Sequence, residues 1–129
     1  MNISAGHPIL ERNNVRVQGE GSRTFLLAHG FACDQTMWRF LMPHIAEESQ
    51  LVLFDYTGCG RSDVTQFDST RYADLNGYAQ DVIEICDALQ LNGVCFVGHS
   101  VSATIGMLAA IKRPDLFSSL VLVCPSPCF

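Results

Sequence analysis

The sequence predicts a doubly wound α/β fold, in which helices cover both faces of a mostly parallel β-sheet. Short apolar runs without polar alternation are typical of strands that are buried on both faces. They occur at 24–28, 51–54, 95–97 and 119–123. Segments with helical spacing of apolar residues lie between them. A chain of 129 residues that is 48% hydrophobic is long enough for one domain with one core, which excludes a multi-domain protein.

The N-terminal part predicts a sheet edge. Residues 9–18 alternate weakly between apolar and polar side chains. Turn signals stand at Asn13-Asn14 and at Gly19-Glu20-Gly21, so we expect an antiparallel hairpin at one edge of the sheet. The next strand, 24–28, is expected to be buried and to end at His29-Gly30.

The middle of the chain predicts a helix, a strand and a loop. Residues 38–46 have the pattern of an amphipathic helix that buries Trp38, and the strand 51–54 follows. The loop 55–63 contains Gly58-Cys59-Gly60, which superficially resembles a dinucleotide-binding loop. Its third glycine is missing and no helix opens directly after it, so we expect an ordinary turn.

The clearest helix follows this loop. Its apolar face has helical spacing and consists of Tyr78, Val82, Ile85, Cys86 and Leu89. We expect the acidic side chains on the same segment to point outward to solvent; these are Asp81, Glu84 and Asp87.

A candidate nucleophile elbow surrounds Ser100. The segment 98–102, Gly-His-Ser-Val-Ser, follows an apolar run at 94–97 and precedes a helix-like segment at 103–111. In such an elbow the serine lies on a strained strand-to-helix turn and its hydroxyl projects above the sheet. The N-terminus of the helix favours developing negative charge. Ser102 stands where the G-x-S-x-G pattern usually has glycine, and serine is small enough to fit there.

A second segment is expected to complete the site. Serine needs a base to become a good nucleophile, and the tetrahedral oxyanion needs preorganised donors. One donor is the main-chain N–H after the serine, here Val101, and the other comes from the loop after the third strand. That loop contains His29-Gly30-Phe31, so we expect the Phe31 N–H to be the second donor. We also expect Phe31 and His99 to contact the substrate, and Asp34 to hold the loop through backbone hydrogen bonds.

The general base has no candidate in its usual position. In this fold the acid and the histidine follow the serine along the chain. All four histidines precede Ser100; they are His7, His29, His44 and His99. Asp115 follows Ser100, but the sequence Arg113-Pro114-Asp115 is typical of a solvated turn.

Composition excludes several classes of protein. A net charge of −5 with scattered Lys and Arg argues against nucleic-acid and anionic-membrane partners. Residues 1–4 do not begin a secretory signal, and the longest apolar-rich segment, 101–111, is far shorter than the roughly 20 residues that span a bilayer. We expect a soluble, cytoplasmic protein.

The cysteines are expected to be free thiols, because no export signal accompanies them. The six are Cys33, Cys59, Cys86, Cys95, Cys124 and Cys128. They form no C-x-x-C pair, so structural zinc is not predicted, and neither a metal nor another cofactor is expected.

Five segments together resemble one group of α/β-hydrolases. They are HGFACDQ (29–35), FDYTGCGRSD (54–63), GYAQDV (77–82), FVGHSVSATIGM (96–107) and RPDLFSSLVLVCPSP (113–127). The group contains the bacterial stress regulator RsbQ and the plant strigolactone and karrikin receptors. The resemblance implies a serine hydrolase with an apolar pocket under a helical lid, in which Ser100 is the nucleophile and the Phe31 and Val101 amides bind the oxyanion.

The resemblance also implies that residues 1–129 are the N-terminal part of a single domain. The fold would then be truncated after the sixth strand, with the lid, the remaining strands and the catalytic aspartate and histidine beyond Phe129. The strand 120–123 would leave an apolar edge for more chain or a partner to cover.

Three functions remain open at this point. The first is hydrolysis of a small ester or lactone through an acyl-Ser100 intermediate. The second is ligand sensing with a signalling protein as partner. The third is a fragment that only binds and has no catalytic activity.

Overall fold

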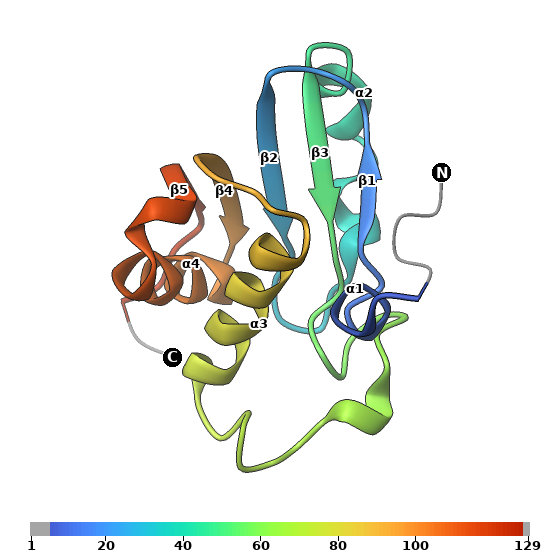
Figure 1. Cartoon of the computed structure of the whole chain (residues 1–129). Coiled ribbons are helices and arrows are strands. Elements are labelled where there is room, and N and C mark those ends of the chain that lie inside the picture. Colours follow the sequence, from blue (N-terminus) through green and yellow to red (C-terminus); the bar gives the residue numbers. More distant parts are fainter. Residues whose placement is uncertain (1–5, 128–129) are drawn as a thin grey trace.

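A five-stranded sheet organises the computed structural model, which describes residues 6–127 (Figure 1). Its strand order is β1-β3-β2-β4-β5; β1 runs antiparallel to β3, and all other neighbours are parallel. The strands are β1 (Arg16–Gln18), β2 (Arg23–Ala28), β3 (Ser49–Leu53), β4 (Val94–His99) and β5 (Phe117–Val123). The predicted mostly parallel α/β fold is therefore confirmed.

Helices cover both faces of this sheet. The α-helices are α1 (Pro8–Arg12), α2 (Met42–Ile45), α3 (Leu75–Ala88) and α4 (Val101–Lys112). Three short 3₁₀ turns are η1 (Gln35–Trp38), η2 (Val64–Gln66) and η3 (Pro114–Leu116). In Figure 1, α3 and α4 lie in front of the sheet and α2 lies behind it. The core is divided accordingly: one apolar cluster packs under α3 and α4, and a second packs under η1 and α2.

The predicted N-terminal hairpin is wrong, because one of its two strands is a helix instead. Residues 8–12 form α1 instead, and only 16–18 form a strand, which pairs with β3. Pro8 occupies the first turn of α1, where its fixed φ favours helix and its missing N–H costs nothing. The edge is antiparallel as expected, but the described sheet has five strands and not six.

The prediction of one continuous helix over residues 38–46 is also wrong. Asp34 caps the 3₁₀ turn η1 by accepting a hydrogen bond from the Thr36 N–H, and a separate one-turn helix begins at Met42. Pro43 lacks the N–H that a continuous helix needs and its ring would clash with the carbonyl of Arg39. Trp38 is buried as expected.

Asp81 is the third difference, because its carboxylate is buried and not directed to solvent. It lies 3.1 Å from Arg12 Nη2 and 2.6 Å from Arg71 Nη2, and it accepts hydrogen bonds from Thr57 and Tyr72. These partners come from α1 and from the loops before α3, so they are invisible in the helical pattern. Asp87, by contrast, is exposed and pairs with Arg113 as a solvent-facing acid would.

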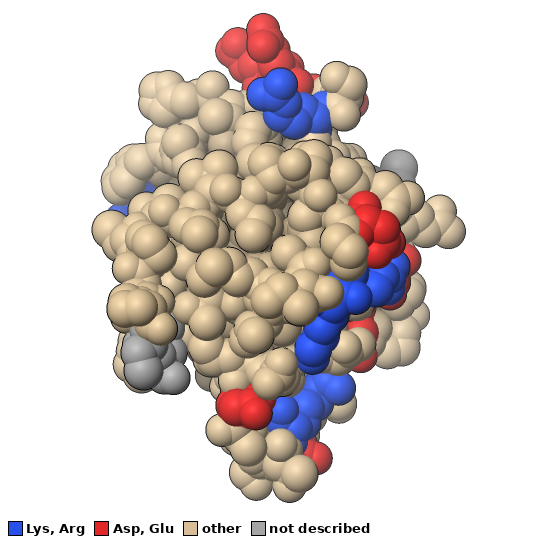
Figure 2. Space-filling model, turned by 90° about the vertical axis from the view of Figure 1, so that its left-hand side faces the viewer, with Lys and Arg blue, Asp and Glu red and all other residues tan. Residues whose placement is uncertain are grey.

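The β5 side of the sheet carries the exposed apolar residues that the sequence predicts there. Val121 and Leu122 are 44% and 36% exposed, respectively. Figure 2 shows the molecule from this side, with charged groups gathered mainly toward the rim of a broad uncharged surface. Within residues 6–127, no helix is long and apolar enough to cross a bilayer.

Candidate active site

Ser100 occupies the sharp turn between β4 and α4. Its backbone has φ 57° and ψ −117°, a conformation that costs energy for a residue with a side chain and is concentrated at functional sites. The Ser100 N–H donates to the Val123 carbonyl of β5 across 2.9 Å, which helps to hold the turn. A Cβ at Gly98 would lie 2.7 Å from the Ser102 carbonyl oxygen, so glycine is needed there for the turn to close. The predicted elbow geometry is present.

The loop after β2 lies directly beside this turn. Ala28 of β2 is in register with Gly98 of β4, so the two chains leave the sheet side by side. A Cβ at Gly30 would overlap Nδ1 of the His99 ring, which shows how closely the loop and the elbow approach. Neither the Phe31 N–H nor the Val101 N–H has a hydrogen-bond acceptor within residues 6–127. Two free donors from distant parts of the chain are thus brought together.

His29 helps to fix the direction of one of these donors, together with the Cys33 N–H, which donates to the same Gly30 carbonyl at 3.2 Å. Its Nε2 accepts the Tyr56 N–H at 3.1 Å, so the ring proton is on Nδ1, which donates to the Gly30 carbonyl at 2.8 Å. Burial lowers the pKa of His29 and keeps the ring neutral. In a trans peptide the Gly30 carbonyl and the Phe31 N–H point in opposite directions. Holding the carbonyl therefore aims the N–H.

Ser102 connects the elbow helix to the same loop. Its Oγ donates to the His29 carbonyl oxygen, which can only accept, and therefore accepts the Tyr56 O–H at 2.8 Å. Burial strongly raises the pKa of Tyr56, so the phenol keeps the proton that it donates. Ser102 is fully buried. The serine that departs from the usual glycine thus makes two hydrogen bonds that glycine cannot make.

Asp55 organises the loops around the site, a role that the sequence did not reveal. Its carboxylate accepts hydrogen bonds from the Gln35 N–H at 2.9 Å, the Arg61 N–H at 3.0 Å and the Asn14 side chain at 3.0 Å. These groups belong to three different loops. Asp34 makes a backbone hydrogen bond of the expected kind, since it accepts the Thr36 N–H at 2.8 Å, and Asp55 shares the role of holding the loop by accepting the neighbouring Gln35 N–H. The signal that could have revealed this role is the position of Asp55 at the buried end of β3.

A cavity of about 340 Å³ has both Phe31 and Val101 among its lining residues. Its walls come from the loops after β2 and β3 and from the first turns of α3 and α4. Phe31 lines this cavity with a side chain that is 85% exposed, whereas His99 packs against Gly30 and is absent from the lining. A substrate contact by either residue stays a prediction.

Three candidates for a general base, His29, His44 and Asp115, are unsuited to act on Ser100. Both ring nitrogens of His29 are engaged within the protein, and His44 is exposed on α2. Asp115 pairs with Arg113 at 3.1 Å, which lowers the pKa of its carboxyl group. The solvated-turn interpretation of Asp115 agrees with its exposure.

The described part of the chain also holds no group of three or more His, Cys, Asp or Glu side chains arranged for a metal ion. Its free cysteines are Cys33, Cys59, Cys86, Cys95 and Cys124, and Cys128 lies outside the described residues.

Comparison with known proteins identifies the family. Residues 23–129 match the family model described as the alpha/beta hydrolase fold. The chain belongs to the α/β-hydrolase family. The structure of a hydrolase from Oleispira antarctica superposes with a TM-score of 0.92 at 46% identity, covering 94% of this chain and 44% of that one.

Two plant relatives have similar sequence identity to this chain. The karrikin insensitive 2 receptor CA of Petunia hybrida is 48% identical over 91% of this chain and 43% of its own length. The strigolactone esterase D14 of Arabidopsis thaliana is 45% identical over 95% of this chain and 46% of its own. The chain therefore spans less than half the length of these relatives.

Proposed function

We propose that Ser100 is the nucleophile of a serine hydrolase that acts on a small, neutral ester or lactone. The observation that carries this proposal is the strained Ser100 turn beside two free main-chain donors. In the reaction, Oγ attacks the substrate carbonyl carbon and the carbonyl oxygen becomes an oxyanion. The Phe31 and Val101 N–H groups donate to this oxyanion, and its collapse expels the alkoxide and leaves acyl-Ser100. Water then attacks the acyl group and frees the serine.

The general base comes, in this proposal, from outside residues 1–129. The curated relatives are about twice as long as the present chain, since it covers 43–46% of them. The base takes the proton of Ser100 during attack and returns it to the leaving oxygen. Residues 1–129 by themselves would form an incomplete enzyme, with only the residual rate enhancement that an oxyanion site provides.

A small and uncharged substrate fits the cavity beside the amides. No described Asp, Glu, Lys or Arg lines it, and its one imidazole, His29, is kept neutral by burial. A charged substrate would lose hydration without gaining an ionic partner. This proposal includes no nucleic-acid partner, no membrane partner and no cofactor. We place the protein in the cytoplasm, because we expect its cysteines to be free thiols.

Ligand sensing is the second candidate function. It is favoured by one observation, namely that similar proteins are named both as receptors and as esterases. In this alternative the same site binds or slowly hydrolyses the ligand, and a signalling protein docks to the occupied form. The third candidate function is ligand binding without catalysis.

Turnover of a chromogenic ester separates these functions. The protein that carries this sequence should hydrolyse p-nitrophenyl acetate, and Ser100→Ala should abolish that activity. Equal turnover by Ser100→Ala would reject Ser100 as the nucleophile. Thermal stabilisation by a ligand without turnover, together with capture of a partner only when ligand is present, would support sensing.

A further inference from the structure

Asn13, the first residue after α1, is fully buried and holds the segment that follows β3. Its side-chain nitrogen donates to the Asp55 carbonyl oxygen at 2.9 Å and to Thr57 Oγ1 at 3.2 Å. Its side-chain oxygen accepts the Arg12 Nε–H at 2.7 Å, and because a guanidinium can only donate, the orientation of the amide is fixed. The main-chain carbonyl of Asn13 also accepts the Asp55 N–H at 2.9 Å. Asn13 therefore fixes the peptide that joins Asp55 to Tyr56.

The other end of this peptide contacts His29. In a trans peptide the C=O and the N–H point in opposite directions, so the carbonyl that bonds to Asn13 places the Tyr56 N–H on the far side. That N–H donates to Nε2 of His29 at 3.1 Å, and the Nδ1–H across the ring donates to the Gly30 carbonyl at 2.8 Å. The Gly30–Phe31 peptide in turn directs the Phe31 N–H.

These groups form a hydrogen-bonded series in which every bond points the same way. Each member accepts a hydrogen bond on one side and donates one on the other; the members are the Asn13 side-chain amide, the 55–56 peptide, the His29 ring and the 30–31 peptide. Hydrogen bonds in such a chain polarise one another in an interior of low dielectric constant. The series therefore makes the Phe31 N–H a stronger and better aimed donor than an isolated amide.

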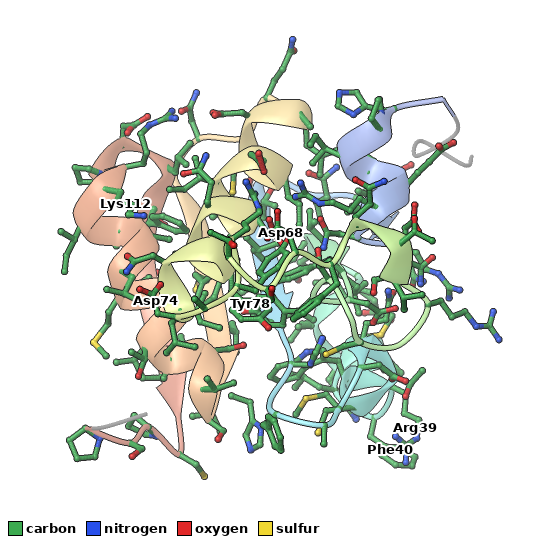
Figure 3. The ribbon with its side chains drawn as sticks, turned by 90° about the horizontal axis from the view of Figure 1, so that it is seen from below. Arg39, Phe40, Asp68, Asp74, Tyr78 and Lys112 are labelled. Atoms are coloured by element: carbon green, nitrogen blue, oxygen red, sulfur yellow. The ribbon has the colours of Figure 1, made fainter. Side chains whose placement is uncertain are left out.

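The series is buried and anchored at its far end. Asn13, His29 and Asp55 are at most 1% exposed. Arg12, which donates to Asn13, is itself held by Asp81 at 3.1 Å and Glu84 at 3.2 Å. In Figure 3 the segment that follows β3 lies between α1 and η1, so it connects two parts of the chain that are separate in sequence.

We propose that Asn13 is a positioning residue for the oxyanion site, which acts on the Phe31 N–H through the 55–56 peptide and the ring of His29. This inference rests on the proposed function, because it gives Asn13 a part in the same reaction. When negative charge develops on the substrate oxygen, the dipoles of the series already point toward it and need not reorient. The Cys33 N–H also holds the Gly30 carbonyl, at 3.2 Å, so the series strengthens this alignment and does not supply all of it.

NMR of the full chain tests the series without any catalysis. Asn13→Leu removes the side-chain donor at similar size, and Asn13→Asp removes it but keeps an acceptor for Arg12, so one folded variant is sufficient. Either substitution should shift the ring nitrogen resonances of His29 and the amide proton of Phe31. Unchanged His29 and Phe31 resonances in a folded variant would overturn the inference.

Asn14→Gly is the matched control for these shifts. Asn14 donates from the same kind of side chain to the Asp55 carboxylate at 3.0 Å, which lies outside the series. Its φ of 46° suits glycine, so the substitution adds no backbone strain. Asn14→Gly should leave the ring resonances of His29 in place. Shifts as large as those of Asn13→Leu would mean that any loosening around Asp55 has this effect, and would contradict the series.

Ester hydrolysis by the protein that carries this sequence tests what the series does for the reaction. Asn13→Leu should lower kcat about 3- to 10-fold with little change in KM, because the loss falls on the oxyanion donor. His29→Gln keeps an acceptor for the Tyr56 N–H but not the bond to Gly30. In that background Asn13→Leu should lower kcat no further, since the series is already interrupted. Equal fold losses in both backgrounds would overturn the positioning role.

Failure of this inference is distinguishable from failure of the proposed function. If Ser100→Ala hydrolyses the ester as fast as the unsubstituted protein, the proposed function is wrong and the positioning role falls with it, whatever the NMR shifts. If Ser100→Ala is inactive but Asn13→Leu and Asn13→Asp keep full kcat, only the positioning role is wrong.

Discussion

The Nδ1–H of His29 donates to the Gly30 carbonyl oxygen across 2.8 Å, and this bond orients the peptide that carries the Phe31 N–H. The buried His29 imidazole thus acts on the proposed oxyanion indirectly, through the Gly30–Phe31 peptide. His29 is a positioning residue in this account, since both of its ring nitrogens bond within the protein and it acts on the oxyanion only through the Gly30–Phe31 peptide.

Two amide substitutions of His29 separate its two hydrogen bonds. In His29→Asn the side-chain nitrogen reaches the place of Nδ1 and keeps the bond to Gly30, whereas in His29→Gln the longer side chain reaches the place of Nε2 and keeps the bond from Tyr56. In the ester-hydrolysing protein, His29→Gln should lower kcat about 10- to 100-fold with little change in KM. His29→Asn should retain most of kcat. Equal kcat losses in both variants would indicate a structural role alone.

Ser102 should contribute to stability through its two buried hydrogen bonds. Ser102→Ala leaves the Tyr56 hydroxyl and the His29 carbonyl without this partner, which should cost about 1–3 kcal/mol of unfolding free energy. Denaturant unfolding measures this cost, and Tyr56→Phe completes a double-mutant cycle. The two losses should be non-additive. Strictly additive losses would show that the two hydroxyl groups do not interact.

Asp81 and Asp87 form a matched pair for testing the buried ion pairs. Asp81→Asn removes the buried one of the two carboxylates that compensate Arg12 and Arg71. It should destabilise by about 3 kcal/mol, the low end for breaking a buried pair, because Glu84 still pairs with both arginines. Asp87→Asn removes an exposed partner of Arg113 and should cost less than about 1 kcal/mol. Both values follow from chemical denaturation. Similar costs for the two variants would contradict the burial of Asp81.

Stability should fall on mild acidification because of His29. Burial lowers its pKa in the folded state below the value of about 6.5 in the unfolded chain, so the unfolded state takes up the proton first. The contribution of neutral His29 to the unfolding free energy is therefore complete above about pH 6.5, and it decreases as the pH falls below this value. The unfolding free energy, measured between pH 7.5 and 5, should show a smaller slope in His29→Asn. An unchanged slope would mean that His29 does not titrate in this way.

Strands and the elbow were predictable because their signals are local. The apolar runs and the segment 98–102 specify strand, turn and helix without reference to the rest of the chain. The motif also leads to the proposal that the Phe31 and Val101 N–H groups act together. Pro8 and Pro43 altered two elements that hydrophobic periodicity alone had predicted. Proline acts through its missing N–H and fixed φ, which a pattern of hydrophobicity does not record.

Long-range polar contacts were not predictable from the pattern. The partners of Asp81 come from α1 and from the loops before α3, and those of Asp55 come from three loops. At both positions the hydrophobic periodicity does not indicate whether the acidic side chain is paired with a cation.

Covalent labelling tests the central claim most directly. The protein that carries this sequence should take up one fluorophosphonate group, located on Ser100 by peptide mass spectrometry. Ser100→Ala should take up none, and Ser102→Ala, which removes the neighbouring serine, should still be labelled. An adduct on another residue, or equal labelling of Ser100→Ala, would contradict the assignment of Ser100 as the nucleophile.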